Sequence, residues 1–284
     1  MPDSGEETEL PLTFTPLGTA LGARVTGLDV TNISTEDARV LYENWLKYHV
    51  LVVPGPIISE DQLVDFGRCF GALENARRQS VLALRPEIMV ISNIRENGET
   101  VGALPDGELS FHFDRLHQKV PNKAGVLHAM EIPDAGGDTW FANMSLAYDT
   151  LPEATKARLE GLTALNTYEY GQTHSANKKL DADAPTAVHP VVRTVPETGR
   201  KALFICRLMT DRILELPEAE SRALLDELCD HAESQRFVYA HQWTPGDILI
   251  WDNRCTIHAR TDFDGRQRRL MKRVTVGDDT PPVH

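Results

Sequence analysis

The segment SFHFDRLH, residues 110–117, concentrates side chains that bind transition metals. Imidazole nitrogens and carboxylate oxygens are common ligands of iron, copper and zinc ions. In an extended strand, residues i and i+2 point to the same face of the sheet, so His112 and Asp114 can both reach one ion. Phe111 and Phe113 would then pack on the opposite face. The spacing therefore predicts two protein ligands of a metal site that needs a third.

A third ligand is predicted at His258, in the segment WDNRCTIHAR, which contains the end of an apolar run. Two histidines and one carboxylate on one side of an ion leave the opposite positions open. This arrangement suits Fe(II) when it must bind both a cosubstrate and dioxygen. The alternative is that a short His-x-Asp pattern arises by chance in a strand. His117 and His128 have no partner motif, and we interpret them as strand or core histidines.

The composition favours a globular protein that acts on a small molecule. The chain has 284 residues, of which 41% are hydrophobic and 25% charged, and its formal net charge is -13. An acidic chain without a long Lys/Arg run argues against nucleic-acid binding, which needs a basic surface. No stretch reaches the roughly 18 apolar residues of a membrane span. Four widely spaced cysteines without a CxxC pair predict reduced thiols and a cytoplasmic protein.

The elements that position the predicted ligands are mainly strands. Apolar runs of strand type recur from residue 88 onward, broken by Gly, Pro and Asp turns. They occupy residues 88–94, 124–132, 138–144, 201–208, 247–253 and 270–276. Helical periodicity or capping signals mark residues 34–49, 59–71, 145–162 and 217–234. Many strands with a few helices predict a β-sandwich or open barrel with helices packed outside.

A single domain over residues 11–284 is the simplest organisation, because no repeat or low-complexity linker divides the chain. Residues 1–10 form an acidic N-terminal segment that we expect to be mobile. Residues 171–190 are the least patterned internal stretch. They predict a long loop, and loops of this length often serve as lids or binding segments.

Several separated motifs, taken in order, resemble the Fe(II)- and 2-oxoglutarate-dependent dioxygenases of the taurine dioxygenase and dichlorophenoxyacetate dioxygenase type. The motifs are FGALE, HFD, GGDTWFANM, WTPGDILIWDNRCTIHARTDF and RRLMKRVTV. The resemblance implies a double-stranded β-helix core, the jelly-roll also found in cupins. It also implies an oxidoreductase that uses Fe(II), 2-oxoglutarate and O2, and that assembles from identical chains.

The resemblance also gives roles to individual residues. It implies that iron is bound by three of them: His112, Asp114 and His258. It implies that Thr139 and Arg269 hold the distal carboxylate of 2-oxoglutarate, which suits a guanidinium fork assisted by a hydroxyl. Arg273 lies where members of this family hold the anionic group of the primary substrate. On one strand the two arginines share a face and lie ~13 Å apart; the alternative is a solvated basic patch.

The substrate pocket departs from that of the taurine-oxidising members. The segment after FGALE lacks the histidine that helps those members hold a sulfonate, so a carboxylate is favoured. Met209 is expected to form an adaptable apolar wall. Tyr168 and Asn93 are further candidates for the wall, with strand packing and strand capping as the respective alternatives. Arg115 and Arg207 are candidates for a second anion contact, and the alternative is that they face solvent.

These features predict hydroxylation of a small organic acid with an apolar or aromatic body, with succinate and CO2 as co-products. The intact carboxylate of the His-x-Asp pattern favours oxygen transfer, because related halogenating enzymes lack it. Two alternatives stay open. One keeps the cofactors but desaturates or otherwise oxidises an amino-acid-derived biosynthetic substrate. The other is a β-barrel that binds a metal or an acid without turnover.

Overall fold

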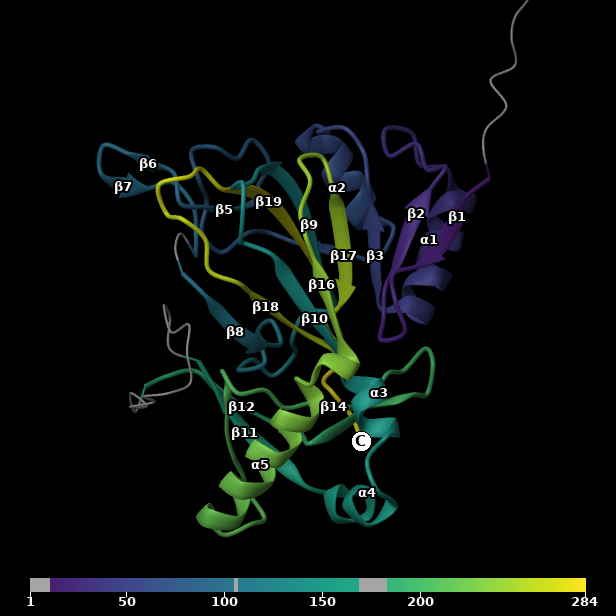
Figure 1. The fold of residues 1–284 in the computed structure, drawn as a ribbon, viewed down its shortest axis with the longest axis vertical. Coiled ribbons are helices and arrows are strands. Elements are labelled where there is room, and N and C mark those ends of the chain that lie inside the picture. Colours follow the sequence, from purple (N-terminus) through teal and green to yellow (C-terminus); the bar gives the residue numbers. More distant parts are fainter. Residues whose placement is uncertain (1–10, 105–106, 169–182) are drawn as a thin grey trace, which may run out of the picture.

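A large antiparallel sheet forms one wall of the molecule in the computed structural model, which describes residues 11–104, 107–168 and 183–284 (Figure 1). The eight strands have the order β1-β2-β3-β17-β9-β19-β4, and β5 also pairs with β19. Only the β2–β3 pair is parallel among these neighbours. The strands are β1 (Thr13–Pro16), β2 (Ala23–Thr26), β3 (Val50–Val53), β4 (Leu73–Glu74), β5 (Met89–Ser92), β9 (Ala124–Glu131), β17 (Ile248–Asp252) and β19 (Leu270–Val276).

A four-stranded sheet, in the order β16-β10-β18-β8, packs against the large sheet. Its strands are β8 (Leu109–His112), β10 (Thr139–Asn143), β16 (Val238–His241) and β18 (Thr256–Arg260). The core between the sheets joins Phe141 of β10 to Trp251 of β17, with ring centroids 5.8 Å apart. Gly125 of β9 leaves room for the Trp251 indole, because a Cβ there would lie 2.3 Å from the ring. Two such sheets around one core form the predicted jelly-roll.

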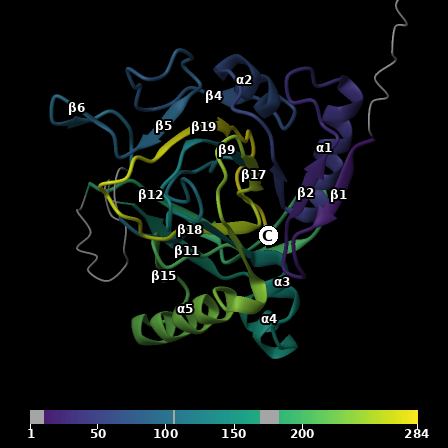
Figure 2. The same ribbon diagram turned by 45° about the horizontal axis from the view of Figure 1, so that its top comes forward.

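Helices and short sheets cover the two ends of the jelly-roll. On the outer side of the large sheet lie α1 (Thr35–Tyr48) and α2 (Glu60–Arg68), as Figure 2 shows. At the other end, α3 (Met144–Asp149), α4 (Glu153–Leu159) and α5 (Glu218–Ala232) surround a three-stranded sheet and a hairpin. The strands there are β11 (Thr163–Thr167), β12 (Thr186–Pro190), β15 (Thr210–Ile213), β13 (Val192–Thr194) and β14 (Lys201–Leu203). A two-stranded ribbon, β6 (Arg95–Glu96) and β7 (Glu99–Thr100), and a 3-10 helix, Gln235–Phe237, complete the described elements.

The predicted helix starts are confirmed by their caps. The Ser34 hydroxyl accepts from the Asp37 amide while the Asp37 carboxylate accepts from the Ser34 amide, which is a reciprocal capping box. Ser59 and Gln62 form the same arrangement at the start of α2. Such caps satisfy amides that have no partner within the helix. Because these signals are local in sequence, the helix starts could be predicted without knowledge of the fold.

The loop prediction for residues 171–190 is wrong at its C-terminal end. Residues Thr186–Pro190 form β12, which pairs in antiparallel register with β11. The first three residues of β12 are exposed or half-buried, and only its last two are buried, so the stretch lacks the strong apolar signal of a central strand. Residues 169–182 lie outside the described part of the chain.

The described residues include no helix that is long and apolar enough to cross a membrane. All four cysteines are free thiols, as the sequence predicts: Cys206, Cys229 and Cys255 are buried and Cys69 is half-buried. Burial raises the pKa of Cys69 to about 11 and raises the pKa values of Cys229 and Cys255 further. These thiols pack as small apolar side chains.

Candidate metal centre

The two predicted histidine ligands face each other across neighbouring strands. In the β8–β18 ladder His112 is directly opposite His258, and the ring centroids are 4.1 Å apart. Their Nε2 atoms lie 3.9 and 3.8 Å from Oδ1 of Asp114. Two ligand atoms bound at roughly 2.1 Å from one ion are at most about 4.2 Å apart, so these spacings fit a shared metal ion. We call these three residues the iron triad, after the metal that the sequence resemblance implies.

Both histidines are held in the neutral form that binds metals. Burial lowers the pKa of His112 and lowers that of His258 well below its usual value, with the neighbouring His112 ring as a second cause for His258. The Nδ1 atom of His112 lies 2.9 Å from the carbonyl oxygen of Ser110. Because a carbonyl only accepts, Nδ1 carries the proton and the Nε2 lone pair is left for a metal.

The Asp114 carboxylate is ionised despite its burial. Burial alone would raise the pKa of Asp114, but the Arg273 guanidinium holds it well below its usual value. Arg273 donates to Oδ2 of Asp114 at 2.5 Å and to Oδ1 at 3.2 Å. The guanidinium also lies over the Trp251 ring, with 5.1 Å from its carbon to the ring centroid. Arg273 therefore holds one side of the carboxylate while Oδ1 faces the histidines.

Strand pleating does not place Asp114, contrary to the sequence interpretation. Strand β8 ends at His112, so Asp114 lies beyond the ladder that orients the histidines. The next residue, Arg115, has a left-handed backbone with φ of 56°, which turns the chain away from the sheet. The prediction that His112 and Asp114 would share a strand is wrong, although their side chains do converge.

Thr139 and Arg269 line the same cavity as the iron triad, which has a volume of about 60 Å³. The Arg269 side chain is buried, and its Nε has no hydrogen-bond partner among the residues that the structure describes. Burial, followed by the nearby Arg260, lowers the pKa of Arg269 to about 9. No ion pair to a carboxylate compensates this cation within residues 11–104, 107–168 and 183–284. A buried cation of this kind fits an anionic ligand.

The Thr139 hydroxyl is also prepared for a ligand. Its oxygen accepts a hydrogen bond of 3.0 Å from the indole Nε1 of Trp243, so the hydroxyl proton remains to be donated. Trp243 was not predicted from the sequence, because no local pattern links this residue to a threonine 104 positions away. The Asp138–Thr139 segment follows two glycines. At Gly137, where φ is 69°, the Cβ of any other residue would lie 3.1 Å from Arg269 Nε.

A second cavity of about 340 Å³ shares His112, Asp114 and Arg273 with the first. Besides Arg273, three further residues predicted for the substrate pocket line it: Arg115, Tyr168 and Met209. The remaining wall is largely apolar and includes Met89, Ala103, Leu104, Leu109 and Leu208. Arg77 also lines this cavity and was not predicted from the sequence. His117 lines it as well, although its sequence context was interpreted as that of a strand or core histidine. The His117 ring stacks on Tyr168 with centroids 5.2 Å apart.

Two pocket predictions are corrected by the contacts of the side chains. The Asn93 amide donates to the carbonyls of Gly265 and Gln267, and its oxygen accepts from the Arg269 amide, so it caps the chain before β19. Arg207 pairs instead with acidic residues of and just after α5: Asp226, Asp230 and Glu233. Neither residue lines the two cavities of the site.

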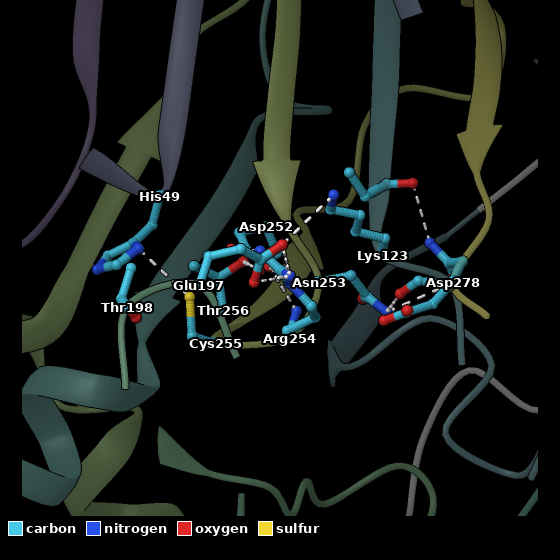
Figure 3. A network of polar contacts seen from close by, with 12 residues as sticks. His49, Lys123, Glu197, Thr198, Asp252, Asn253, Arg254, Cys255, Thr256 and Asp278 are labelled. Atoms are coloured by element: carbon cyan, nitrogen blue, oxygen red, sulfur yellow. Dashed lines mark hydrogen bonds and ion pairs between the residues drawn. The ribbon is translucent and has the colours of Figure 1, made fainter. Parts of the chain in front are cut away.

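A second buried group of potential ligands lies at the β17–β18 turn and consists of His49, Asp252 and Cys255 (Figure 3). We call it the inner cluster. The Arg254 guanidinium donates to both oxygens of Asp252, each at 2.8 Å. His49 Nδ1 lies 3.3 Å from Cys255 Sγ, and its Nε2 lies 3.3 Å from an Arg200 nitrogen. The polar atoms of the inner cluster are therefore used by the protein itself.

Residues 13–275 match the family model described as taurine catabolism dioxygenase TauD, TfdA family. The chain belongs to this family. TauD/TfdA dioxygenases use Fe(II), 2-oxoglutarate and O2, and the chain is an oxidoreductase of this type. The iron triad and the buried Arg269 fit these requirements, because they offer three metal ligands and a cation for a dicarboxylate around one cavity.

The similar curated proteins act on different small molecules. The (S)-phenoxypropionate/alpha-ketoglutarate-dioxygenase of Sphingobium herbicidovorans is 34% identical, over 93% of this chain and 94% of its own length. The alpha-ketoglutarate-dependent 2,4-dichlorophenoxyacetate dioxygenase of Cupriavidus pinatubonensis is 35% identical, over 93% and 97%. Pentalenolactone F synthase of Streptomyces arenae is 32% identical, over 95% of each chain.

The fold of this TauD/TfdA member is also similar to solved structures. The crystal structure of AAD-2 in complex with Mn(II) and N-oxalylglycine superposes with a TM-score of 0.81 and 29% sequence identity, covering 96% of this chain and all of AAD-2. Mn(II) and N-oxalylglycine stand in for Fe(II) and 2-oxoglutarate. The predictions of the family, the jelly-roll and the cofactors are thus confirmed.

Proposed function

We propose that this dioxygenase hydroxylates a small organic carboxylate, with Fe(II) held by the iron triad and 2-oxoglutarate held by Thr139 and Arg269. Bound iron and 2-oxoglutarate supply the oxidising chemistry, with succinate and CO2 as co-products. The observation that carries the residue assignment is Arg269, a buried cation without a carboxylate partner among the described residues. It opens on the cavity that also contains the three candidate ligands.

The residues of the chain act mainly by holding their partners in place. His112 and His258 present neutral Nε2 atoms, and Arg273 keeps Asp114 ionised and directs Oδ1 toward them. Trp243 orients the Thr139 hydroxyl, so that its proton can be donated to a carboxylate oxygen. These groups are fixed by buried contacts before a ligand binds, which reduces the cost of ordering them.

The primary substrate is proposed to be an acid with an apolar or aromatic body, bound in the second cavity. Apolar side chains form most of its wall, and the stacked His117 and Tyr168 rings offer a flat surface. The similarity to enzymes named for phenoxypropionate and dichlorophenoxyacetate supports an aryl ether acid, in which hydroxylation next to the ether oxygen would cleave the bond.

Arg273 is proposed to hold the substrate carboxylate. If the oxidised carbon is adjacent to the carboxylate, the anion must lie close to the metal, and Arg273 contacts the ligand Asp114 itself. A guanidinium has five N–H donors, and Asp114 accepts from only two of those of Arg273. Its Nε has no partner in the described structure. Arg77, which lines the same cavity without an acidic partner in that part of the chain, would instead suit an acid whose carboxylate is remote from the oxidised carbon.

The test of the cofactor assignment is anaerobic addition of Fe(II) and 2-oxoglutarate, followed by the weak visible metal-to-ligand charge-transfer band. We expect the band in the wild type and its loss in His112→Ala and Arg269→Ala. The matched control is Arg268→Ala, because Arg268 is the adjacent arginine but is exposed and paired with Glu131. Absence of a band in the wild type would contradict the proposal, and a normal band in Arg269→Ala would remove Arg269 from the cosubstrate site.

A second candidate reaction keeps the cofactors but oxidises a biosynthetic substrate in another way, which the similarity to pentalenolactone F synthase favours. Product mass distinguishes the two, because hydroxylation adds one oxygen and desaturation removes two hydrogens. A screen should therefore couple succinate release to mass spectrometry of the acid. Succinate release that does not respond to any acid would argue against both reactions.

We also infer that identical chains assemble, on the strength of the family resemblance, and that the enzyme works in the cytoplasm, where its free thiols stay reduced. Light scattering of the purified protein measures its mass. A monomer at micromolar concentration would contradict the first inference.

A further inference from the structure

Within the described structure the main chain at Asp114 has no strand partner, although Asp114 is a proposed iron ligand. The β8–β18 ladder ends at the His112–His258 pair, and Arg115 turns away with positive φ. A buried peptide group without a hydrogen-bond partner is costly, so some other group must take up the N–H and C=O of Asp114.

The Asn253 side chain takes the place of the missing strand. Its Oδ1 accepts from the Asp114 amide at 2.8 Å, and its Nδ2 donates to the Asp114 carbonyl at 3.0 Å. The second Nδ2 proton goes to the Asn122 carbonyl at 2.9 Å. Asn253 is 0% exposed. A carboxamide presents a carbonyl oxygen beside an N–H donor, as a neighbouring strand would, so it can pair with both polar groups of Asp114, and its second N–H is left for Asn122.

Asn253 is itself fixed by the turn between β17 and β18 (Figure 3). Its amide donates to the Lys123 carbonyl at 3.0 Å. The residues around Asn253 are bonded to one another. The Arg254 guanidinium binds the Asp252 carboxylate, and the Thr256 hydroxyl donates to the Asp252 carbonyl at 2.7 Å. Arg254 is in turn paired with Glu197. The turn is therefore buried and held by hydrogen bonds and an ion pair, and it leads directly into the strand that carries His258.

We propose that Asn253 is a positioning residue that sets where Asp114 presents its carboxylate to the metal. The inference rests on the proposed function, because it assumes that the iron triad binds the ion. Arg273 donates to both oxygens of Asp114, with the shorter contact to Oδ2, and the main chain fixed by Asn253 opposes this attraction and keeps Oδ1 near the histidines. Without Asn253, Asp114 would follow Arg273 and the three ligand atoms would no longer converge.

The experiment measures metal affinity separately from stability. Metal-free wild type, Asn253→Ala and Asn253→Ser are titrated with Co(II), whose visible absorption reports affinity and coordination, and each metal-free protein is melted. Residues that orient metal ligands typically contribute 10- to 100-fold to affinity, so we expect a loss of roughly that size in both variants, with a changed Co(II) spectrum. The matched control is Thr256→Val, which removes a hydrogen bond from the same turn without touching Asp114. It should lower the melting temperature and leave Co(II) affinity within about twofold.

The outcomes separate this inference from the function on which it rests. If the wild type does not bind Co(II), the proposed metal site is wrong. If the wild type binds and the folded Asn253 variants bind equally well, the positioning role of Asn253 is overturned. Should neither variant fold, hydrogen exchange of the wild type decides: the Asp114 amide is expected to be as protected as the amides of β9, and fast exchange there would refute the inference.

Discussion

The iron triad and the inner cluster have nearly the same composition but differ in the contacts that their polar atoms make. Each combines a histidine, an aspartate and one further potential ligand, all buried and with ligand atoms within 4.8 Å of one another. In the inner cluster Arg254 occupies both oxygens of Asp252. Arg273 likewise donates to both oxygens of Asp114, so the two clusters differ in their histidines. Both ring nitrogens of His49 contact protein groups, whereas the Nε2 atoms of the iron triad lie 3.8 and 3.9 Å from Asp114 Oδ1, too far for hydrogen bonds. A metal site thus needs imidazole nitrogens that are not bonded to the other ligands, and residue types alone do not reveal this.

The largest effect on stability is expected from Arg254→Met. Loss of the guanidinium leaves the buried Asp252 carboxylate uncompensated, which typically costs about 3–5 kcal/mol of unfolding free energy. Urea unfolding of the metal-free protein measures it. The loss of Co(II) affinity should be smaller than in Asn253→Ala. A stability loss below about 1 kcal/mol would mean that the inner cluster is not the tightly paired support described above.

His258→Ala should show the opposite pattern. One of three ligands is removed, so metal affinity should fall by more than the roughly 100-fold expected for a residue that only orients a ligand. The unfolding free energy should fall less than in Arg254→Met, because a neutral side chain is removed and no buried charge is left without its partner. Co(II) titration and urea unfolding of the same preparations test both statements, and equal Co(II) affinity in variant and wild type would exclude His258 as a ligand.

A pH effect should follow from His49 of the inner cluster. Burial, only partly offset by Asp252, lowers the pKa of His49 to about 4 from an unfolded value near 6.5. Between these values the unfolded chain binds a proton that the folded chain does not, so stability rises with pH and falls on acidification. At pH 5 this residue should lower the unfolding free energy by about 2 kcal/mol relative to pH 7. His49→Gln should flatten the pH dependence by that amount, and an unchanged slope would show that His49 is protonated in the fold.

The smallest effect separates two threonine hydroxyls. Thr139 has a proton to spare, whereas the proton of Thr256 is already donated to the Asp252 carbonyl. Thr139→Val should raise the KM for 2-oxoglutarate about tenfold, which is the value of one hydrogen bond to a charged group. Thr256→Val should leave this KM unchanged while lowering the melting temperature. Equal KM values in Thr139→Val and wild type would remove Thr139 from the cosubstrate site.

The features predicted correctly from sequence depend on local signals or on long motifs. Ser34 and Ser59 announce their helices within four residues, and the order of motifs identified the family. The sequence also predicts that Arg269 and Arg273 share a face, and both line one cavity, although Arg269 precedes β19 and a bulge follows at Leu270/Met271. Even spacing was therefore not the full reason for their shared orientation.

The errors concern partners that are distant in sequence. Asn93 donates to a turn more than 170 residues away, so it is not available to the pocket. Arg207 forms ion pairs with acidic residues of and just after α5, so it is not available either. Asp114 is held by Asn253, 139 positions away, and not by a strand pleat. Only the fold brings such partners together, and a side chain's own type gives no sign of them.

The state of the four thiols has a practical consequence for an enzyme whose iron reacts with O2. Oxidants attack the thiolate, and a pKa of about 11 leaves roughly one part in ten thousand of Cys69 in that form at neutral pH. Cys206, Cys229 and Cys255 are additionally closed off from solvent. The protein should therefore tolerate aerobic purification without added reductant, and oxidative inactivation during turnover should begin at the metal centre and the side chains around it, not at the cysteines.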